Sequence, residues 1–351
     1  MTDAWLDVRR QLQTNRHAWG TDAAADYPAE RWVAGTPLLA PASWFPVQPI
    51  PLGAIRLEYD AAAVFNGVTG EGSNAVPSSY SSYADAIAAL ARPAVFENRP
   101  TYRLLSADLT APDPVLRLGR GTYFDSINTG EASAHEYAAR RLGMQSSTPL
   151  RDAIGHPWEP ARRPTNLAIS TLVIRKDTTS TFLMHWRDPT KVGHAGGLYQ
   201  VVPSGIFQPS ADATWNELHD FNLWHNLTRE LAEELLGTSE DHGSNNAPIN
   251  YDTWPFATTL TAALTNGTAH AYCVGLGVDP LTFATDLLTI LIIDATTYDA
   301  LFPTTITHNT EGRVLTPQPF TPAVLKDFIH HKPLQPAGAA ILQLAWDNNL
   351  A

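Results

Sequence analysis

Short apolar runs separated by polar residues dominate the second half of the chain. The strongest are AHAYCVGLGVD at 269–279 and LLTILIID at 287–294. Runs of this length that are rich in β-branched residues are typical of buried strands. NLAISTLVIRK at 166–176 and STFLMHWRD at 180–188 have the same character, and the polar residues between them predict a hairpin. We therefore expect this half to form a β-sheet.

One predicted helix in this half carries three carboxylates on adjacent turns. The segment NLTRELAEELLG at 226–237 has the leucine spacing of an amphipathic helix, and Gly237 is its expected stop. Glu230, Glu233 and Glu234 project from nearly one face, because positions three and four apart are neighbours on a helix. Like charges placed in this way repel unless a cation lies between them. Taken alone, the pattern also fits an ordinary helix whose acidic face is solvated.

The first half mixes helical and strand patterns. Three segments predict strands: AIRLEYD at 54–60, TYRLLSADL at 101–109 and VLRLGRGTYFDSI at 115–127. GEASAHEYAARRL at 130–142 predicts a helix whose basic end suits the helix dipole. Helices and strands are thus expected in both halves, and the fold class is α/β of the α+β kind.

A segment with several prolines and arginines, RDAIGHPWEPARRPT at 151–165, predicts a linker between two units. We therefore expect an N-terminal accessory domain at 1–160 and a second domain at 161–351. The first of these carries no pattern with a defensible chemistry. Its expected role is to wall one side of a pocket or to form contacts in a homodimer.

Composition and charge limit the class of partner. The chain has 351 residues, of which 44% are hydrophobic, enough for a sizeable buried core. Acidic residues outnumber basic ones 35 to 23, which gives a net charge of −12, and no run of Lys or Arg is long enough to follow a phosphate backbone. Nucleic acid is therefore not an expected partner. A phosphorylated small molecule is compatible with the carboxylates if a divalent cation holds it.

Three observations bear on the compartment. Cys273 is the only cysteine, so no intrachain disulfide forms, and a reducing environment is favoured. The first twenty residues mix charges with apolar side chains and lack the apolar core of a secretion signal. The apolar run at 287–294 is too short to cross a bilayer. We expect a cytoplasmic protein with no membrane contact.

The loop before the carboxylate helix completes a larger pattern. PSGIFQPS at 203–210 follows a predicted strand and precedes RELAEELLG at 229–237. A glycine loop followed by a helix with the order Arg-Glu-apolar-any-Glu-Glu resembles the signature of the Nudix hydrolases. The resemblance covers roughly residues 165 to 335. It implies a Nudix-like mixed β-sheet sandwiched between helices, preceded here by the α+β accessory domain.

The resemblance assigns roles residue by residue. Glu230, Glu233 and Glu234 match the family's metal-binding glutamates, and Arg229 matches the arginine that orients a glutamate by a salt bridge. Gly205 matches the glycine of the loop, which is expected to lie beside the substrate. The implied cofactor is Mg²⁺, or Mn²⁺, because carboxylate oxygens bind such ions and the ion assists the attack of water on phosphorus. Glu233, Glu230 and Arg229 are the expected catalytic residues.

Further candidates lie near this pattern. Arg187 and Lys191 precede the glycine loop and are expected to meet the phosphates or a base of the substrate, although a surface salt bridge would also explain them. Glu311 is a candidate for a further carboxylate, and a simple turn residue is the alternative. The spacing of three histidines matches no metal or acid–base motif, and a hydrogen-bonded role is favoured: His185, His194 and His225.

The chain also departs from the family pattern. Ala211 stands where the family has a loop glutamate, and 23 residues separate Gly205 from Arg229, more than the pattern allows. Glu217, inside this insertion, is a candidate substitute carboxylate. The expected function is the hydrolysis of a diphosphate-linked small molecule, such as a nucleoside diphosphate derivative. Two alternatives stay open: a ligand-binding or regulatory protein that no longer cleaves its ligand, and a Nudix-fold enzyme redirected to a biosynthetic reaction.

Overall fold

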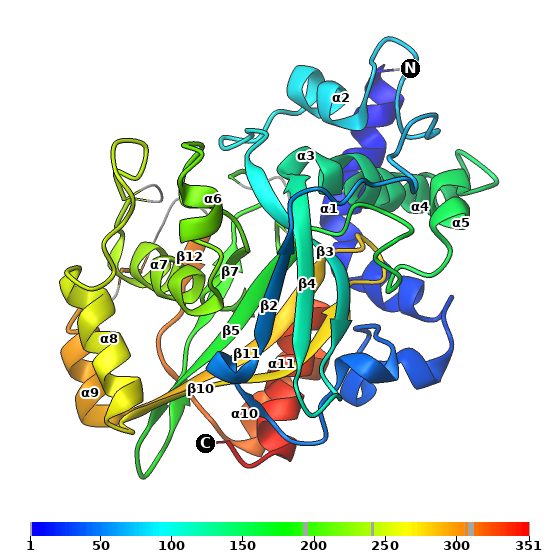
Figure 1. Cartoon of the computed structure of the whole chain (residues 1–351). Helices are drawn as coiled ribbons and strands as arrows, with labels where there is room; N and C mark the ends of the chain where they lie inside the picture. Colours follow the sequence, from blue (N-terminus) through cyan, green and yellow to red (C-terminus); the bar gives the residue numbers. More distant parts are fainter. Residues whose placement is uncertain (1, 192–195, 240–241, 305, 308–311, 351) are drawn as a thin grey trace.

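The computed structural model describes residues 2–191, 196–239, 242–304, 306–307 and 312–350. Figure 1 shows an α+β protein built around one large mixed sheet and two three-stranded sheets. The large sheet contains β1 (Ile50–Pro51), β5 (Leu167–Lys176), β6 (Thr181–Phe182), β9 (Ser204–Ile206), β10 (Ala269–Val278), β11 (Thr285–Asp294) and β13 (Gln318–Pro319). The small sheets are β2 (Arg56–Asp60), β4 (Val115–Thr122) and β3 (Pro100–Asp108), and β12 (Gly312–Val314), β7 (Met184–Arg187) and β8 (Tyr199–Val201).

Strands β5 and β11 form the parallel centre of the large sheet, and β10 pairs antiparallel with β11. Almost every residue of β5 and β11 is buried, as their continuous apolar sequences require when both faces of a sheet are covered. The other edge of β5 is shared by two short strands. β6 pairs with the C-terminal part of β5 at Ile174, and β9 pairs with its N-terminal part, where Gly205 lies opposite Ile169. The predicted glycine loop is therefore a short strand on the central sheet.

The helices surround this sheet. Those of the first half are α1 (Thr2–Ala24), α2 (Tyr83–Leu90), α3 (Tyr123–Ser126), α4 (Ala132–Arg141) and α5 (Pro149–Ile154). Those of the second half are α6 (Asn216–His219), α7 (Leu223–Leu236), α8 (Pro255–Thr265), α9 (Ala295–Leu301), α10 (Pro322–His331) and α11 (Pro336–Asp347). Helix α11 packs on β5, β10 and β11, whereas α8 packs on β10 and contacts both α7 and α9 (Figure 1).

The structure confirms most of the predicted elements and corrects three. The strand predicted at 180–188 is two short strands, β6 and β7, which belong to different sheets. The strands predicted at 166–176, 269–279 and 287–294 are β5, β10 and β11. The strand predicted at 115–127 ends at Thr122, because the backbone N–H of Thr122 donates to the Asp125 carboxylate and starts α3. The linker predicted at 151–165 begins inside α5, so its first residues are helical.

Buried side chains from both halves form one continuous hydrophobic core. The two halves are also joined through their backbones. The N–H of Tyr102 in β3 donates to the carbonyl of Phe207 at 3.0 Å, and the N–H of Leu104 donates to the carbonyl of Thr165 at 2.7 Å. The domain boundary near residue 160 stays a prediction. The two halves of the chain are packed against each other.

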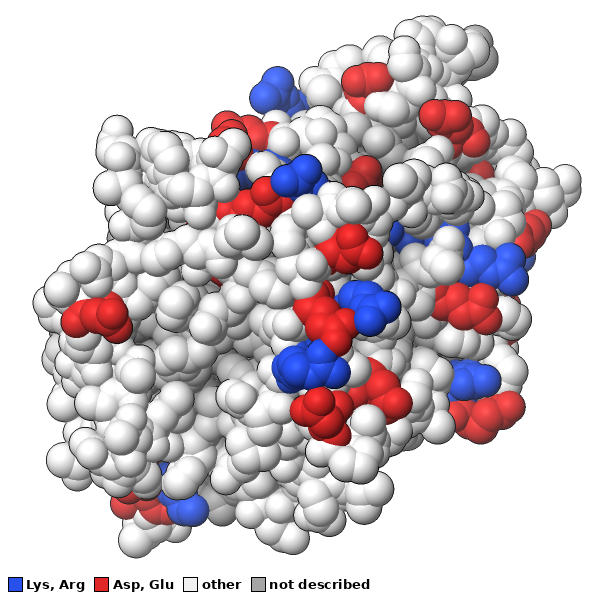
Figure 2. Space-filling view, viewed as in Figure 1, with Lys and Arg blue, Asp and Glu red and all other residues white. Residues whose placement is uncertain are grey.

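The surface seen in Figure 2 carries acidic and basic side chains close together. Strands β2 and β4 carry such an ion pair, Arg117 with Glu58 at 2.7 Å. In the described part of the chain, no helix has both the length and the apolar character needed to cross a membrane.

Candidate functional site

A pocket of about 260 Å³ lies between the two halves of the chain. Six of the seven site residues predicted from the sequence line it: Arg187, Lys191, Gly205, Glu230, Glu233 and Glu234. They come from β7 and the residues after it, from β9 and from α7. The seventh, Arg229, does not line the pocket and lies behind its wall. The fold therefore places in one pocket residues from three separate segments of the sequence.

Helix α7 presents its glutamates to this pocket because its ends and its apolar face are fixed. Its N-cap, Asn222, accepts hydrogen bonds from the N–H groups of Trp224 and His225, and Gly237 ends it in a left-handed conformation with φ of 72°. The leucines of its predicted apolar face are buried: Leu227, Leu231 and Leu235. Glu230 and Glu233 are half-buried and Glu234 is buried, so the acidic face is not simply solvated.

Gly205 lies directly beneath one of these carboxylates. A Cβ atom added to Gly205 would overlap the carboxylate carbon and both carboxylate oxygens of Glu230. The backbone of Gly205 is not in the left-handed region, so its glycine is required here by close approach and not by a turn. The packing of strand β9 against α7 thus fixes where the Glu230 carboxylate can lie.

We predict that Gly205→Ala lowers by about 10²-fold any turnover that depends on the Glu230 carboxylate, because the methyl group must displace that carboxylate. The melting temperature should change little, since the displaced group is the end of a flexible side chain. The matched control is Gly53→Ala, where an added Cβ meets nothing within 4 Å. Steady-state kinetics and thermal melts on both variants would check this, and Glu230→Asp should partly rescue Gly205→Ala. Wild-type kinetics in Gly205→Ala would contradict it.

Glu234 has a different environment from its two neighbours. One of its oxygens accepts a hydrogen bond from the Ser204 N–H at 2.7 Å. The other lies 3.5 Å from Nδ1 of His185, which is fully buried. Glu234 therefore joins β9 to α7, and its second oxygen faces the buried ring of His185 in β7. The hydrogen-bonded role of His185 stays a prediction.

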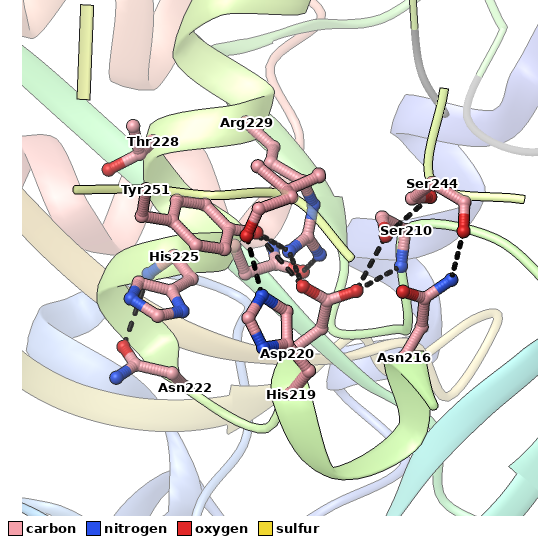
Figure 3. A network of polar contacts seen from close by, with 12 residues as sticks. Ser210, Asn216, His219, Asp220, Asn222, His225, Thr228, Arg229, Ser244 and Tyr251 are labelled. Atoms are coloured by element: carbon pink, nitrogen blue, oxygen red, sulfur yellow. Dashed lines mark hydrogen bonds and ion pairs between the residues drawn. The ribbon is translucent and has the colours of Figure 1, made fainter. Parts of the chain in front are cut away.

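Arg229 anchors the loop that follows β9. It is 4% exposed, and it donates to the carbonyl of Gln208 at 2.8 Å and to the hydroxyl of Tyr251 at 2.7 Å (Figure 3). It also forms a buried ion pair with Asp220 at 3.1 Å. Burial alone would lower the pKa of Arg229, but Tyr251, Asp220 and the nearby Glu230 raise it above its ordinary value. Since Gln208 lines the pocket, Arg229 positions the pocket wall.

The insertion between Gly205 and Arg229 closes around Asp220. This carboxylate is fully buried, and its second oxygen accepts from the N–H and the hydroxyl of Ser210 at 2.8 and 2.6 Å. Figure 3 shows these bonds converging with those of Arg229 and Tyr251. The ring of His225 stacks on Tyr251, and burial lowers the pKa of this histidine. The insertion is therefore a fixed support for the loop.

Glu217 does not take the place of the missing loop glutamate. Its carboxylate accepts from the Arg120 guanidinium at 2.9 Å and from the Tyr59 hydroxyl, and it is not among the residues that line the pocket. The hydrogen bonds from Arg120 have a larger effect on the pKa of Glu217 than its partial burial has, so this pKa is lowered. The residue at the family's glutamate position, Ala211, is buried. Glu311 and His194 lie outside the described residues.

Sequence reasoning missed several carboxylates that line the pocket, among them Glu97, Asp279 and Asp286. Asp286, near the start of β11, is 7% exposed and accepts from the Ser170 hydroxyl at 2.7 Å. The Ser170 hydroxyl is in turn 2.8 Å from the hydroxyl of Ser204. The only signal in the sequence is an aspartate at the start of a strongly apolar strand, and that position also suits a simple strand boundary.

The first half of the chain provides part of the pocket wall. Tyr123 and Ile127 line it, together with Glu131 at the end of a π-helical turn, Ile127–Glu131. Such turns are rare and frequently mark functional sites. Glu131 is buried and forms ion pairs with Arg9 at 2.8 Å and with Arg16 at 2.9 Å. The opening helix α1 therefore fixes this wall from behind.

The carboxylates suit a divalent metal ion in kind, because Mg²⁺ and Mn²⁺ prefer oxygen ligands. Within the described residues, however, no group of three or more His, Cys, Asp or Glu side chains is placed to hold a metal ion. Glu234 accounts for part of this, since one of its oxygens already accepts the Ser204 N–H. Glu230 and Glu233 are the half-buried glutamates of the pattern, and both line the pocket.

Comparison with known proteins adds no family assignment. No protein-family model matches this sequence, and no curated protein matches it.

Proposed function

We propose that this pocket is the active site of a Nudix-like, divalent-metal-dependent hydrolase of a diphosphate-linked small molecule. The observation that carries the proposal is the meeting of Glu230, Glu233 and Glu234 with Gly205, Arg187 and Lys191 in one pocket. The Nudix resemblance supplies the type of reaction. Carboxylates beside basic side chains in a partly enclosed pocket are the components that a metal–diphosphate complex needs.

The roles follow from the positions of the side chains. Glu230 and Glu233 would hold Mg²⁺, which neutralises diphosphate charge and makes bound water a better nucleophile. Arg187 and Lys191 would attract the phosphates by charge. Glu233, or a carboxylate beside it, would accept the proton of the attacking water. Gly205 and Glu234 set the positions of these groups, and Arg229 acts through the loop at Gln208 and not on the substrate.

The test is a panel of diphosphate-linked compounds incubated with pure protein and Mg²⁺, with the products analysed by ³¹P NMR. At least one compound should give a monophosphate product, and EDTA should stop its formation. No turnover of any compound, with Mg²⁺ or Mn²⁺ present, would overturn the proposal in its hydrolytic form.

A second function is favoured by one feature of the site. A buried alanine, Ala211, stands where the family pattern has its loop glutamate. A protein that binds a nucleotide-like ligand without cleaving it does not need a glutamate at this position. It would show ligand-induced thermal stabilisation with no product, whereas turnover that is lost in Glu233→Gln would exclude this alternative.

A further inference from the structure

The first turn of α11 forms a part of the pocket that the carboxylate chemistry does not use. Gln335, Pro336 and Ala337 line the pocket, and they are the N-cap and the first two residues of this twelve-residue helix. The Gln335 side chain makes no capping hydrogen bond. Within the described part of the chain, the N–H groups of Ala337 and Gly338 also make no hydrogen bond outside the helix. Nor can the helix satisfy them, because its first N–H groups have no intrahelical acceptor.

A buried amide lies beside this helix end. Gln200, in β8, lines the same pocket and is 2% exposed. Its Nε2 atom is buried and has no hydrogen-bond partner. The strand and the helix start are joined, because the N–H of Gln335 donates to the carbonyl of Tyr199 at 2.9 Å. Buried donors are nearly always satisfied in folded proteins, so an unsatisfied one that lines a pocket is a position where an acceptor atom of a ligand can bind.

The start of α11 and the amide of Gln200 both present hydrogen-bond donors. The N-terminus of a helix carries a partial positive charge and presents N–H donors, which favours an anion. Nε2 of Gln200 is a donor as well. Arg187 and Lys191 line the same pocket, as do the carboxylates on its other walls, so the preference for an anion here comes from the helix start and the amide. An ammonium or guanidinium group has no acceptor atom for these donors, and a neutral oxygen gains less from the helix dipole than an anion does.

We propose that the first turn of α11 and the amide of Gln200 form an anion subsite that binds a phosphate or carboxylate group of the pocket's ligand. This subsite rests on the proposed function in one respect, because the anion is taken to be part of the same ligand whose diphosphate the glutamates would hold through the metal ion. The subsite itself needs no metal ion. It therefore predicts anion binding by the protein in the presence of EDTA.

The experiment is calorimetric titration in EDTA with inorganic phosphate and, separately, with malonate. Wild-type protein should bind at least one of them saturably, and the probe that binds identifies a phosphate or a carboxylate subsite. Gln200→Leu should bind it about ten-fold more weakly or worse. Its melting temperature without ligand should equal or exceed that of wild type, because the unpaired buried donor is gone. A residue that merely supported the fold would show the opposite change.

Two further variants complete the design. Gln343→Leu makes the same substitution on α11 at a residue whose amide donates to Asp347, and it should bind like wild type. Ala337→Asp places a carboxylate at the helix N-terminus, which suits the helix dipole and fills the subsite, so it should fold and lose anion binding. No binding of either probe by wild type would overturn the proposal. So would wild-type affinity in both Gln200→Leu and Ala337→Asp.

Failure of this proposal and failure of the hydrolase proposal are distinguishable. Metal-free anion binding that depends on Gln200, without turnover of any diphosphate, would uphold the subsite and reject hydrolysis. Turnover with the affinity for both probes unchanged in Gln200→Leu and Ala337→Asp would uphold hydrolysis and reject the subsite.

Discussion

Replacement of Glu233 by Gln is expected to reduce turnover by about 10²–10⁴-fold, the range for loss of a positioned proton acceptor. Gln keeps the size of the side chain but removes the charge and the basicity that a metal-bound water requires. Glu233 is only half-buried, so the melting temperature should stay within a degree or two of wild type, by the small effect typical of such positions. Steady-state kinetics and thermal melts measure both quantities.

Two comparisons sharpen this result. Glu71→Gln makes the same change at an exposed loop residue and should behave like wild type. Glu234→Gln should lower stability as well as turnover, because a neutral amide oxygen accepts the Ser204 N–H, which joins α7 to β9, more weakly than the carboxylate does. Undiminished turnover in Glu233→Gln would remove this residue from the chemistry.

Arg229→Met is expected to lower the free energy of unfolding by about 3–5 kcal/mol. The substitution leaves the fully buried Asp220 carboxylate without its cation, and it also removes the donors to Tyr251 and to the Gln208 carbonyl. Breaking one partner of a buried ion pair is costly because the remaining charge has no compensation. Urea unfolding at neutral pH measures the change, and KM should rise because the loop at Gln208 is released.

A double-mutant cycle separates the ion pair from simple loss of packing. Arg229→Met with Asp220→Asn should cost less than the sum of the single variants, because the second change removes the stranded charge. Arg117→Met, at an exposed pair with Glu58, is the control and should cost no more than about 1 kcal/mol. Strictly additive effects at Arg229 and Asp220 would show that the pair does not hold the insertion.

The central strands are predictable because burial on both faces demands a continuous apolar sequence. β5, β10 and β11 appear where such runs occur. The end of β4 is not predictable in this way, because GTYFDS has the aromatic composition of a strand. What ends the strand is a hydrogen bond that the Asp125 carboxylate accepts from the N–H of Thr122. Helix α11 is absent from the elements that the pattern predicted, and it carries the proposed anion subsite.

The candidate site was predictable in part. The spacing of Glu230, Glu233 and Glu234 on one helix face follows from helical geometry alone. The position of Arg229 depends on Asp220 and Tyr251, and the wall at Glu131 depends on Arg9 and Arg16. Such partners are distant in the sequence, and no local pattern identifies them. The same is true of Gln200, whose unsatisfied amide is visible only once its surroundings are known.

The most direct test of the central claim, that these carboxylates form a metal-dependent diphosphate site, is a calorimetric titration with Mg²⁺ in the presence of methylenediphosphonate. It compares wild type with the Glu230→Gln, Glu233→Gln double variant. We predict saturable Mg²⁺ binding by wild type and its loss in the double variant while the fold is retained. No Mg²⁺ binding by wild type, with or without the diphosphonate, or undiminished binding by the double variant, would contradict the account.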